Sequence, residues 1–228
     1  SSSLNSGGAL QTNDPTGSPP IRINSALDES YGNYLNARLA ASQHDMENAA
    51  KFYRASLDAD PSNPDLLARA FLYSVSAGDM ERAPKLATQV VANEPDNRAA
   101  RTTLAVQAMK KGDYDGVRDQ LAKSAQGPFA ALTIELLNTW AAVGQNKTDT
   151  ALADLQMRKA QGGTDSLVAF HRALVLDLGG RTDDANTAYQ EALKATGNGP
   201  RIVDAYGRFL ERQGRTQEAK DFYAKLAS

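Results

Sequence analysis

The stretch that decides the fold is residues 44–61, HDMENAAKFYRASLDADP, because its pattern returns in residues 78–95 as GDMERAPKLATQVVANEP. Short repeated units of this length are typical of helical hairpins that stack into one continuous array, so one core can run along the chain. Equivalent residues lie 34 positions apart, as in the pairs Asp45 and Asp79, Ala49 and Ala83, and Pro61 and Pro95.

The composition is that of an ordinary globular protein and excludes several classes of function. Of 228 residues, 41% are apolar and 23% are charged. The net charge of −2 argues against a nucleic-acid-binding surface, which normally carries a basic excess. The chain has no cysteine, which excludes disulfides, thiolate catalysis and zinc–thiolate sites. The sequence has no apolar run of about 18 residues, so no transmembrane helix is expected.

The same parts recur along the chain. Small residues in a first helix let a second helix cross it closely, which makes a stiff hairpin. These are Ala37, Ala105, Ala173 and Gly207, whereas Phe71 departs from the pattern. A turn residue precedes an alanine of the second helix by five positions, in the pairs His44 and Ala49, Gly78 and Ala83, Gly180 and Ala185, and Gly214 and Ala219. Gly112 and Val117 keep this spacing with a larger residue, and an aromatic follows at Tyr53, Tyr189 and Tyr223.

This combination resembles the tetratricopeptide repeat, a helix–turn–helix unit of 34 residues. The resemblance implies an all-α fold, a right-handed solenoid of about six repeats. The predicted repeats span residues 25–61, 62–97, 98–128, 129–163, 164–198 and 199–228.

The fourth repeat fits the pattern least well. Gly144 precedes Ala151 by seven positions and not five. We therefore expect a lengthened turn, Gln145 to Asp149, between helices over 130–143 and 149–160. Gly162 and Gly163 are expected to end this repeat.

Residues 1–24 are rich in Ser, Gly, Pro and Asn and predict a flexible leader. It is either a disordered terminus or a tether that follows a removed signal or a lipidated residue. The second reading favours export, to the periplasm or a membrane-tethered position, over a cytoplasmic location. Order is expected from Ser25, and Pro61 stops the second helix because proline lacks an amide hydrogen.

No catalytic or metal-binding group of residues is found in the sequence. Residues 113–116, DYDG, resemble the start of a calcium loop, but the glycine stands at the fourth place and not the sixth. His44 and His171 fall in different repeats and form no metal-ligand pair on one helix. We therefore predict no enzyme activity, no cofactor and no metal.

The resemblance implies a concave groove lined by the first helices. An aromatic mouth, an apolar middle and a charged end would suit an amphipathic helix or an extended peptide. The groove residues carried over are Tyr31, Tyr34, Arg38, Leu72, Val75, Thr102, Val106, Met109, Ile134, Asn138, Leu167, Phe170 and Leu174. The charged end comprises Arg201, Asp204, Arg208, Glu211 and Arg212. The alternative for the aliphatic members is that they are core between repeats.

Some members of this family grip a C-terminal carboxylate with basic groups along the first three repeats. Here Arg38 and Lys110 are placed in the groove, but Asp65, Ala68 and Leu72 lie between them. We therefore do not expect such a carboxylate clamp.

The sequence favours a non-catalytic scaffold that binds a protein or peptide during assembly of a larger complex. The Ala-rich, cysteine-free composition favours a bacterial source. The alternative is an accessory array of a larger enzyme or of an envelope polysaccharide or peptidoglycan machine, with catalysis outside this chain. Because no capping helix follows the sixth pair, we expect the protein either to continue past Ser228 or to dimerise through this end.

Overall fold

A computed structural model describes residues 25–160 and 165–227, which form twelve α-helices and no strand. The predicted leader and the Gly162–Gly163 stop lie outside the described residues. The helices are α1 (Ser25–Ser42), α2 (Met46–Ala59), α3 (Pro64–Ser76), α4 (Ala83–Asn93), α5 (Arg98–Lys110), α6 (Tyr114–Ala122), α7 (Pro128–Gly144), α8 (Thr148–Ala160), α9 (Asp165–Leu178), α10 (Thr182–Thr196), α11 (Pro200–Arg212) and α12 (Thr216–Ala227).

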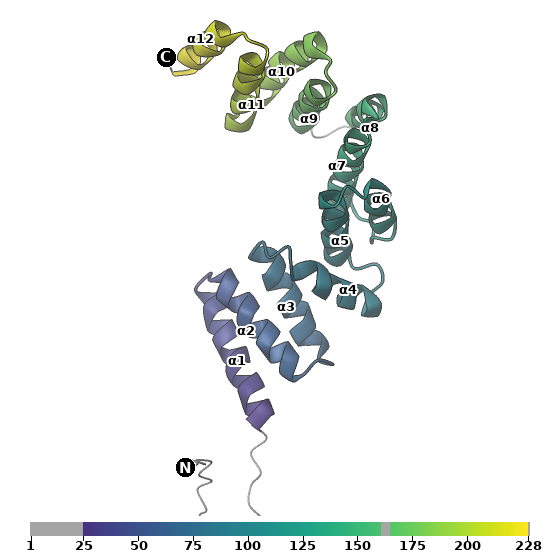
Figure 1. The fold of residues 1–228 in the computed structure, drawn as a ribbon, viewed down its shortest axis with the longest axis vertical. Helices are drawn as coiled ribbons and strands as arrows, with labels where there is room; N and C mark the ends of the chain where they lie inside the picture. Colours follow the sequence, from purple (N-terminus) through teal and green to yellow (C-terminus); the bar gives the residue numbers. More distant parts are fainter. Residues whose placement is uncertain (1–24, 161–164, 228) are drawn as a thin grey trace, which may run out of the picture.

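Each helix packs against the next along the chain, so the helices form six consecutive hairpins. Figure 1 shows the array curving, with α5, α9 and α11 toward the inside of the bend and α6, α10 and α12 toward the outside. This arrangement confirms the predicted all-α helical-repeat solenoid. In these repeats the first helices therefore offer an inner surface and the second helices an outer one.

Every hairpin turns through one residue in the left-handed region of backbone space. The following residue then donates its N–H to a carbonyl five positions back, as from Asp45 to Ala40 at 2.9 Å. This bond satisfies a carbonyl at the end of the first helix and fixes the turn. The turn residues recur every 34 positions: His44 (φ 60°), Gly78 (70°), Gly112 (73°), Asn146 (58°), Gly180 (71°) and Gly214 (73°).

The lengthened turn predicted for the fourth repeat is wrong. Only residues 145–147 separate α7 from α8, and the turn residue is Asn146, which keeps the five-residue spacing to Ala151. Lys147 donates to the carbonyl of Ala142 at 2.9 Å, as in the other turns. Gly144 instead belongs to α7, where an added Cβ would lie 2.2 Å from the ring of Tyr114. Gly144 is therefore needed for the close packing of α7 against Tyr114, and the turn does not depend on it.

Large and small side chains alternate between the two helices of a hairpin. Tyr53 stands opposite Ala37 in the first repeat, whereas Phe71 stands opposite Ala87 in the second, and all four are buried in one cluster. The departure at Phe71 is thus accommodated because the partner position is small. In the sixth repeat, an added Cβ on Gly207 would lie 1.8 Å from the Tyr223 hydroxyl.

Two second helices differ in length for local reasons. Residues 80–82 form turns and α4 begins only at Ala83, because Pro84 has no N–H to donate to the carbonyl of Met80. The other, α6, has only nine residues. Its following loop is held by Arg98, whose guanidinium donates to the carbonyls of Ala125 and Gln126 at 3.3 Å each.

Candidate functional site

The predicted inner-surface residues of the first two repeats include large exposed apolar side chains. Tyr31 is 64% exposed on α1 and Leu72 is 56% exposed on α3. Val75 is also exposed, and Tyr34 is half-buried, with its ring edge-on to Tyr53 at 6.0 Å between centroids. Exposed apolar residues gathered on one side of a protein favour a binding role over a core role.

A pocket of about 360 Å³ opens between α1, the C-terminal end of α2 and the N-terminal half of α3. Tyr31 and Tyr34 contribute its aromatic wall, and Leu66 lies opposite. Asp65 and Arg69 supply charges of both signs at the same pocket. The pocket can therefore receive an apolar side chain flanked by polar groups.

A second pocket, of about 530 Å³, is built in the same way between α9 and α11. It is lined by Leu167, Phe170 and Ile202, which take the repeat positions of Tyr31, Tyr34 and Leu66 four periods later. Arg201 takes the position of Asp65, so the charge at this pocket is reversed. The structure thus brings five predicted residues, Tyr31, Tyr34, Leu167, Phe170 and Arg201, into two equivalent pockets.

Of the other residues predicted for the inner surface, Arg38 is exposed to solvent, whereas four more are partly covered. The structure leaves Thr102, Val106 and Met109 on α5 and Leu174 on α9 half-buried. Met109 and Leu174 pack against the buried clusters of their own repeats, so these two contribute partly to the core.

Ile134 and Asn138 lie elsewhere. Both line a pocket formed with residues of α6 and α8, which are second helices. The two-residue error in the fourth turn shifted the register, and the 34-residue period puts Leu136 and Trp140 at the positions of Phe170 and Leu174. The prediction of Ile134 and Asn138 as inner-surface residues therefore needs this correction.

Trp140 was missed for the same reason and contacts the wall of the second inner pocket. Its indole Nε1–H donates to Nδ1 of His171 at 3.1 Å, and the two rings meet edge-on. His171 lines the pocket beside Phe170. Burial lowers the pKa of His171, so the imidazole stays neutral near pH 7 and can accept this bond.

Charged groups at the C-terminal end of the inner surface pair with each other. Arg208 Nε donates to Asp204 at 3.1 Å, and Arg212 Nη2 donates to Asp177 at 2.5 Å. The buried hydroxyl of Tyr189 also donates to Asp177, at 2.6 Å. Burial and this carboxylate raise the pKa of Tyr189, which keeps the hydroxyl protonated. This network ties α9, α10 and α11 together.

The part of the chain that the structure describes holds no group of three or more His, Cys, Asp or Glu residues able to bind a metal. Among the same residues, none of the helices is both long and apolar enough to cross a membrane. The pockets present apolar walls with charged rims, an arrangement suited to binding a side chain.

These features define a class of protein, an α-helical repeat array with pockets along its first helices. Residues 172–228 match the family model described as the tetratricopeptide repeat. The structure is similar to a tetratricopeptide repeat protein from Parabacteroides merdae, with a TM-score of 0.67 and 11% identity over 87% of this chain and 79% of that one. It is also similar to PilW, a widely conserved type IV pilus biogenesis factor, with a TM-score of 0.61 and 15% identity over 86% of this chain and 91% of that one.

A search of curated protein sequences found no significant match. At these identities the structural likeness establishes the fold, and the family model establishes the repeat sequence at the C-terminal end. The tetratricopeptide repeat is thus shown in the sequence of residues 172–228 and as the fold of the described chain, in agreement with the predicted resemblance.

Proposed function

We propose that this protein is a scaffold that binds a protein or peptide along its first helices during assembly of a larger complex. The observation that carries the proposal is the pair of equivalent pockets, one at Tyr31 and Tyr34 and the other at Leu167 and Phe170. A helix or extended segment with two apolar anchors fits such a surface. Arg201 at the second pocket favours an acidic residue beside the second anchor.

The experiment is capture of the partner in the native cell by chemical crosslinking and mass spectrometry. The double variant Tyr34→Ala and Phe170→Ala removes one aromatic wall from each pocket. We expect the crosslinked partner to be lost while the helical circular dichroism spectrum is retained. Undiminished capture of the same partner would contradict the proposal.

Two further variants separate lost binding from lost folding. Tyr31→Ala removes a side chain that is largely exposed, so it should weaken capture with little effect on stability. Leu226→Ala is the control. It truncates another exposed apolar side chain, on α12 and away from both pockets, and should leave capture unchanged.

PilW suggests one partner class to test. The two chains cover each other almost from end to end, and PilW is a pilus biogenesis factor. Pilus assembly components are therefore the first proteins to look for among the crosslinked partners. The accessory role in a larger enzyme or envelope machine is the second candidate, and a catalytic protein recovered through the inner surface would support it.

A further inference from the structure

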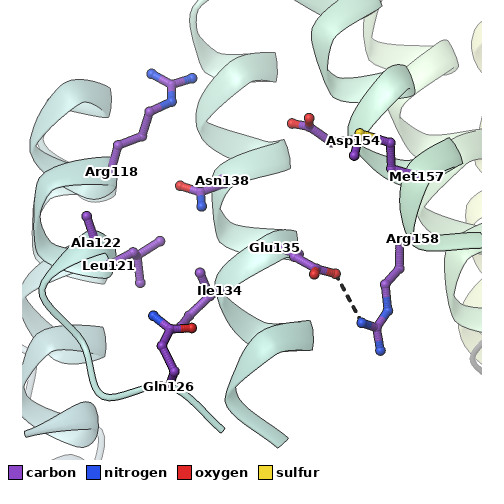
Figure 2. A pocket seen from close by; sticks show the side chains of 10 residues that line it. All are labelled: Arg118, Leu121, Ala122, Gln126, Ile134, Glu135, Asn138, Asp154, Met157 and Arg158. Atoms are coloured by element: carbon purple, nitrogen blue, oxygen red, sulfur yellow. Dashed lines mark ion pairs between the residues drawn. The ribbon is translucent and has the colours of Figure 1, made fainter. Parts of the chain in front are cut away.

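A third pocket, on the side of the second helices, is built differently from the inner pockets. It has a volume of about 500 Å³ and lies between α6, α7 and α8. Figure 2 shows Asn138 pointing from α7 toward α6 and Glu135 pointing from α7 toward α8. Ile134 and Met157 supply apolar surface, with Met157 being 65% exposed, whereas Leu121 is buried.

Three side chains of this pocket carry polar atoms that are shielded from solvent and have no hydrogen-bond partner in the described structure. They are Oδ1 of Asn138, Oε2 of Glu135 and Nε of Arg158. Glu135 Oε2 and Arg158 Nη1 form an ion pair at 3.4 Å (Figure 2), which is longer than an ordinary hydrogen bond. Glu135 Oε2 thus has a charged partner, whereas Asn138 Oδ1 and Arg158 Nε have none, and buried polar atoms without partners are rare and destabilising.

The second repeat shows what these positions hold in a well-packed hairpin. Two periods earlier, the residues equivalent to Glu135, Asn138 and Arg158 are buried members of one apolar cluster. The fourth repeat has therefore replaced core side chains with groups that donate and accept hydrogen bonds. The equivalent core residues are Leu67, Ala70 and Val90.

Hydrogen bonds hold the residues on the α6 side of this pocket in place. Because α6 ends at Ala122, residues 123–127 cross toward α7 early, and Gln126 of this loop lines the pocket. Arg98 holds the loop through the carbonyls of Ala125 and Gln126. Arg118, on the α6 side, is likewise held by Gln145 at 2.8 Å.

The positive and negative charges of the residues that line the pocket are equal in number, and this restricts the charge of the ligand. Arg118 and Arg158 are matched by Glu135 and Asp154, so the pocket favours neither an anion nor a cation. Asn138 and Glu135 offer acceptors and Arg158 offers a donor. An extended peptide is such a ligand, because its main chain is neutral, carries both N–H and C=O groups and can bear apolar side chains.

We propose that this pocket binds an extended peptide segment of a protein partner. Its backbone pairs with the Asn138 amide and the Arg158 guanidinium, which turn toward the ligand about their terminal torsions, and an apolar side chain lies against Ile134 and Met157. This second site is separate from the inner surface, so the array can hold two segments at once.

The test uses a library of random linear peptides displayed on phage and selected against the full chain. Enriched peptides are labelled with a fluorophore and titrated by fluorescence anisotropy. We expect a peptide family whose dissociation constant rises about tenfold on Asn138→Ala or Arg158→Val, as for loss of one hydrogen bond to a charged or amide group. The triple variant Glu135→Leu, Asn138→Ala and Arg158→Val, which installs the second-repeat residues, should abolish binding without lowering the melting temperature.

Phe170→Ala, in the second inner pocket, is the matched control and should leave the affinity of this peptide family unchanged. Peptides that depend on Phe170 and not on Asn138 would report the inner surface and overturn the proposed second site. Enrichment of no peptide over a selection against the triple variant would overturn it as well.

Discussion

At the scale of single residues, the six left-handed turn positions restrict the residue type through their positive φ. Four of the six are glycine, which adopts a positive φ without steric strain, and the others are His44 and Asn146. Asn tolerates this conformation better than most residues, whereas His44 carries a larger side chain there.

Replacement at these turns should change stability in opposite directions. His44→Gly should raise the free energy of unfolding by about 1 kcal/mol, because it relieves the strained backbone. Gly112→Ala, at φ 73°, should lower it by about the same amount. Urea unfolding followed by circular dichroism measures both, and equal effects of the same sign would contradict this account.

His171 makes stability depend on pH. Burial lowers its pKa in the folded state, so the unfolded chain binds a proton that the folded chain excludes. Stability should therefore fall as the pH drops below about 6.5, the ordinary pKa of histidine, until the folded-state pKa is reached. Protonation also removes the acceptor for Trp140, since an imidazolium has no free lone pair.

The measurement is the melting temperature between pH 7.5 and pH 5 in the wild type and in His171→Asn. Asparagine retains an acceptor near Nδ1 and does not titrate, so this variant should lose part of the slope. An unchanged slope in His171→Asn would assign the pH dependence to other groups.

At the scale of helices and turns, the sequence predicted most of the hairpins because each carries a strong local signal. Proline and glycine mark their ends, and small residues recur at the helix crossing. The prediction of the fourth hairpin failed because Gly144 was taken as the turn residue, although the close contact with the Tyr114 ring, and not a positive φ, requires a glycine there. Extending the 34-residue period to Asn146 would have found the turn.

The contact of Gly144 with Tyr114 predicts a costly substitution. Gly144→Ala places a Cβ 2.2 Å from the tyrosine ring, so α6 or the ring must shift. We expect a loss of about 1–3 kcal/mol in unfolding free energy. In the double variant with Tyr114→Ala the two losses should be less than additive, because the clash is gone.

Gly32→Ala is the control for this substitution. Gly32 lies inside α1, and an added Cβ there has no heavy atom within 4 Å. Alanine favours the helix over glycine, so stability should rise by up to about 1 kcal/mol. A similar loss at Gly32 and Gly144 would mean that helix packing does not explain either glycine.

At the scale of the whole molecule, the period predicted the array, but the surfaces depend on distances between helices that no local pattern contains. The two inner pockets, the Trp140–His171 hydrogen bond and the unpaired groups around Asn138 all arise between neighbouring repeats. A register error of two residues was therefore enough to move Ile134 and Asn138 to the wrong surface.

Self-association through the last helix stays a prediction. On α12, Tyr223 is 37% exposed and Leu226 is 39% exposed. If this end pairs with a second copy, light scattering after size-exclusion chromatography should give a dimer mass that Leu226→Asp reduces to that of a monomer. A monomer mass for the wild type at every concentration would exclude this interface.

The inner surface is the central claim, and site-specific photo-crosslinking in the native cell tests it most directly. A photoreactive amino acid is placed at Leu72 or Leu167 on first helices, and at the exposed Gln89 on α4 as the outer control. The account predicts that both inner positions crosslink to the same protein and that Gln89 does not. Crosslinks to that protein from Gln89 alone would contradict it.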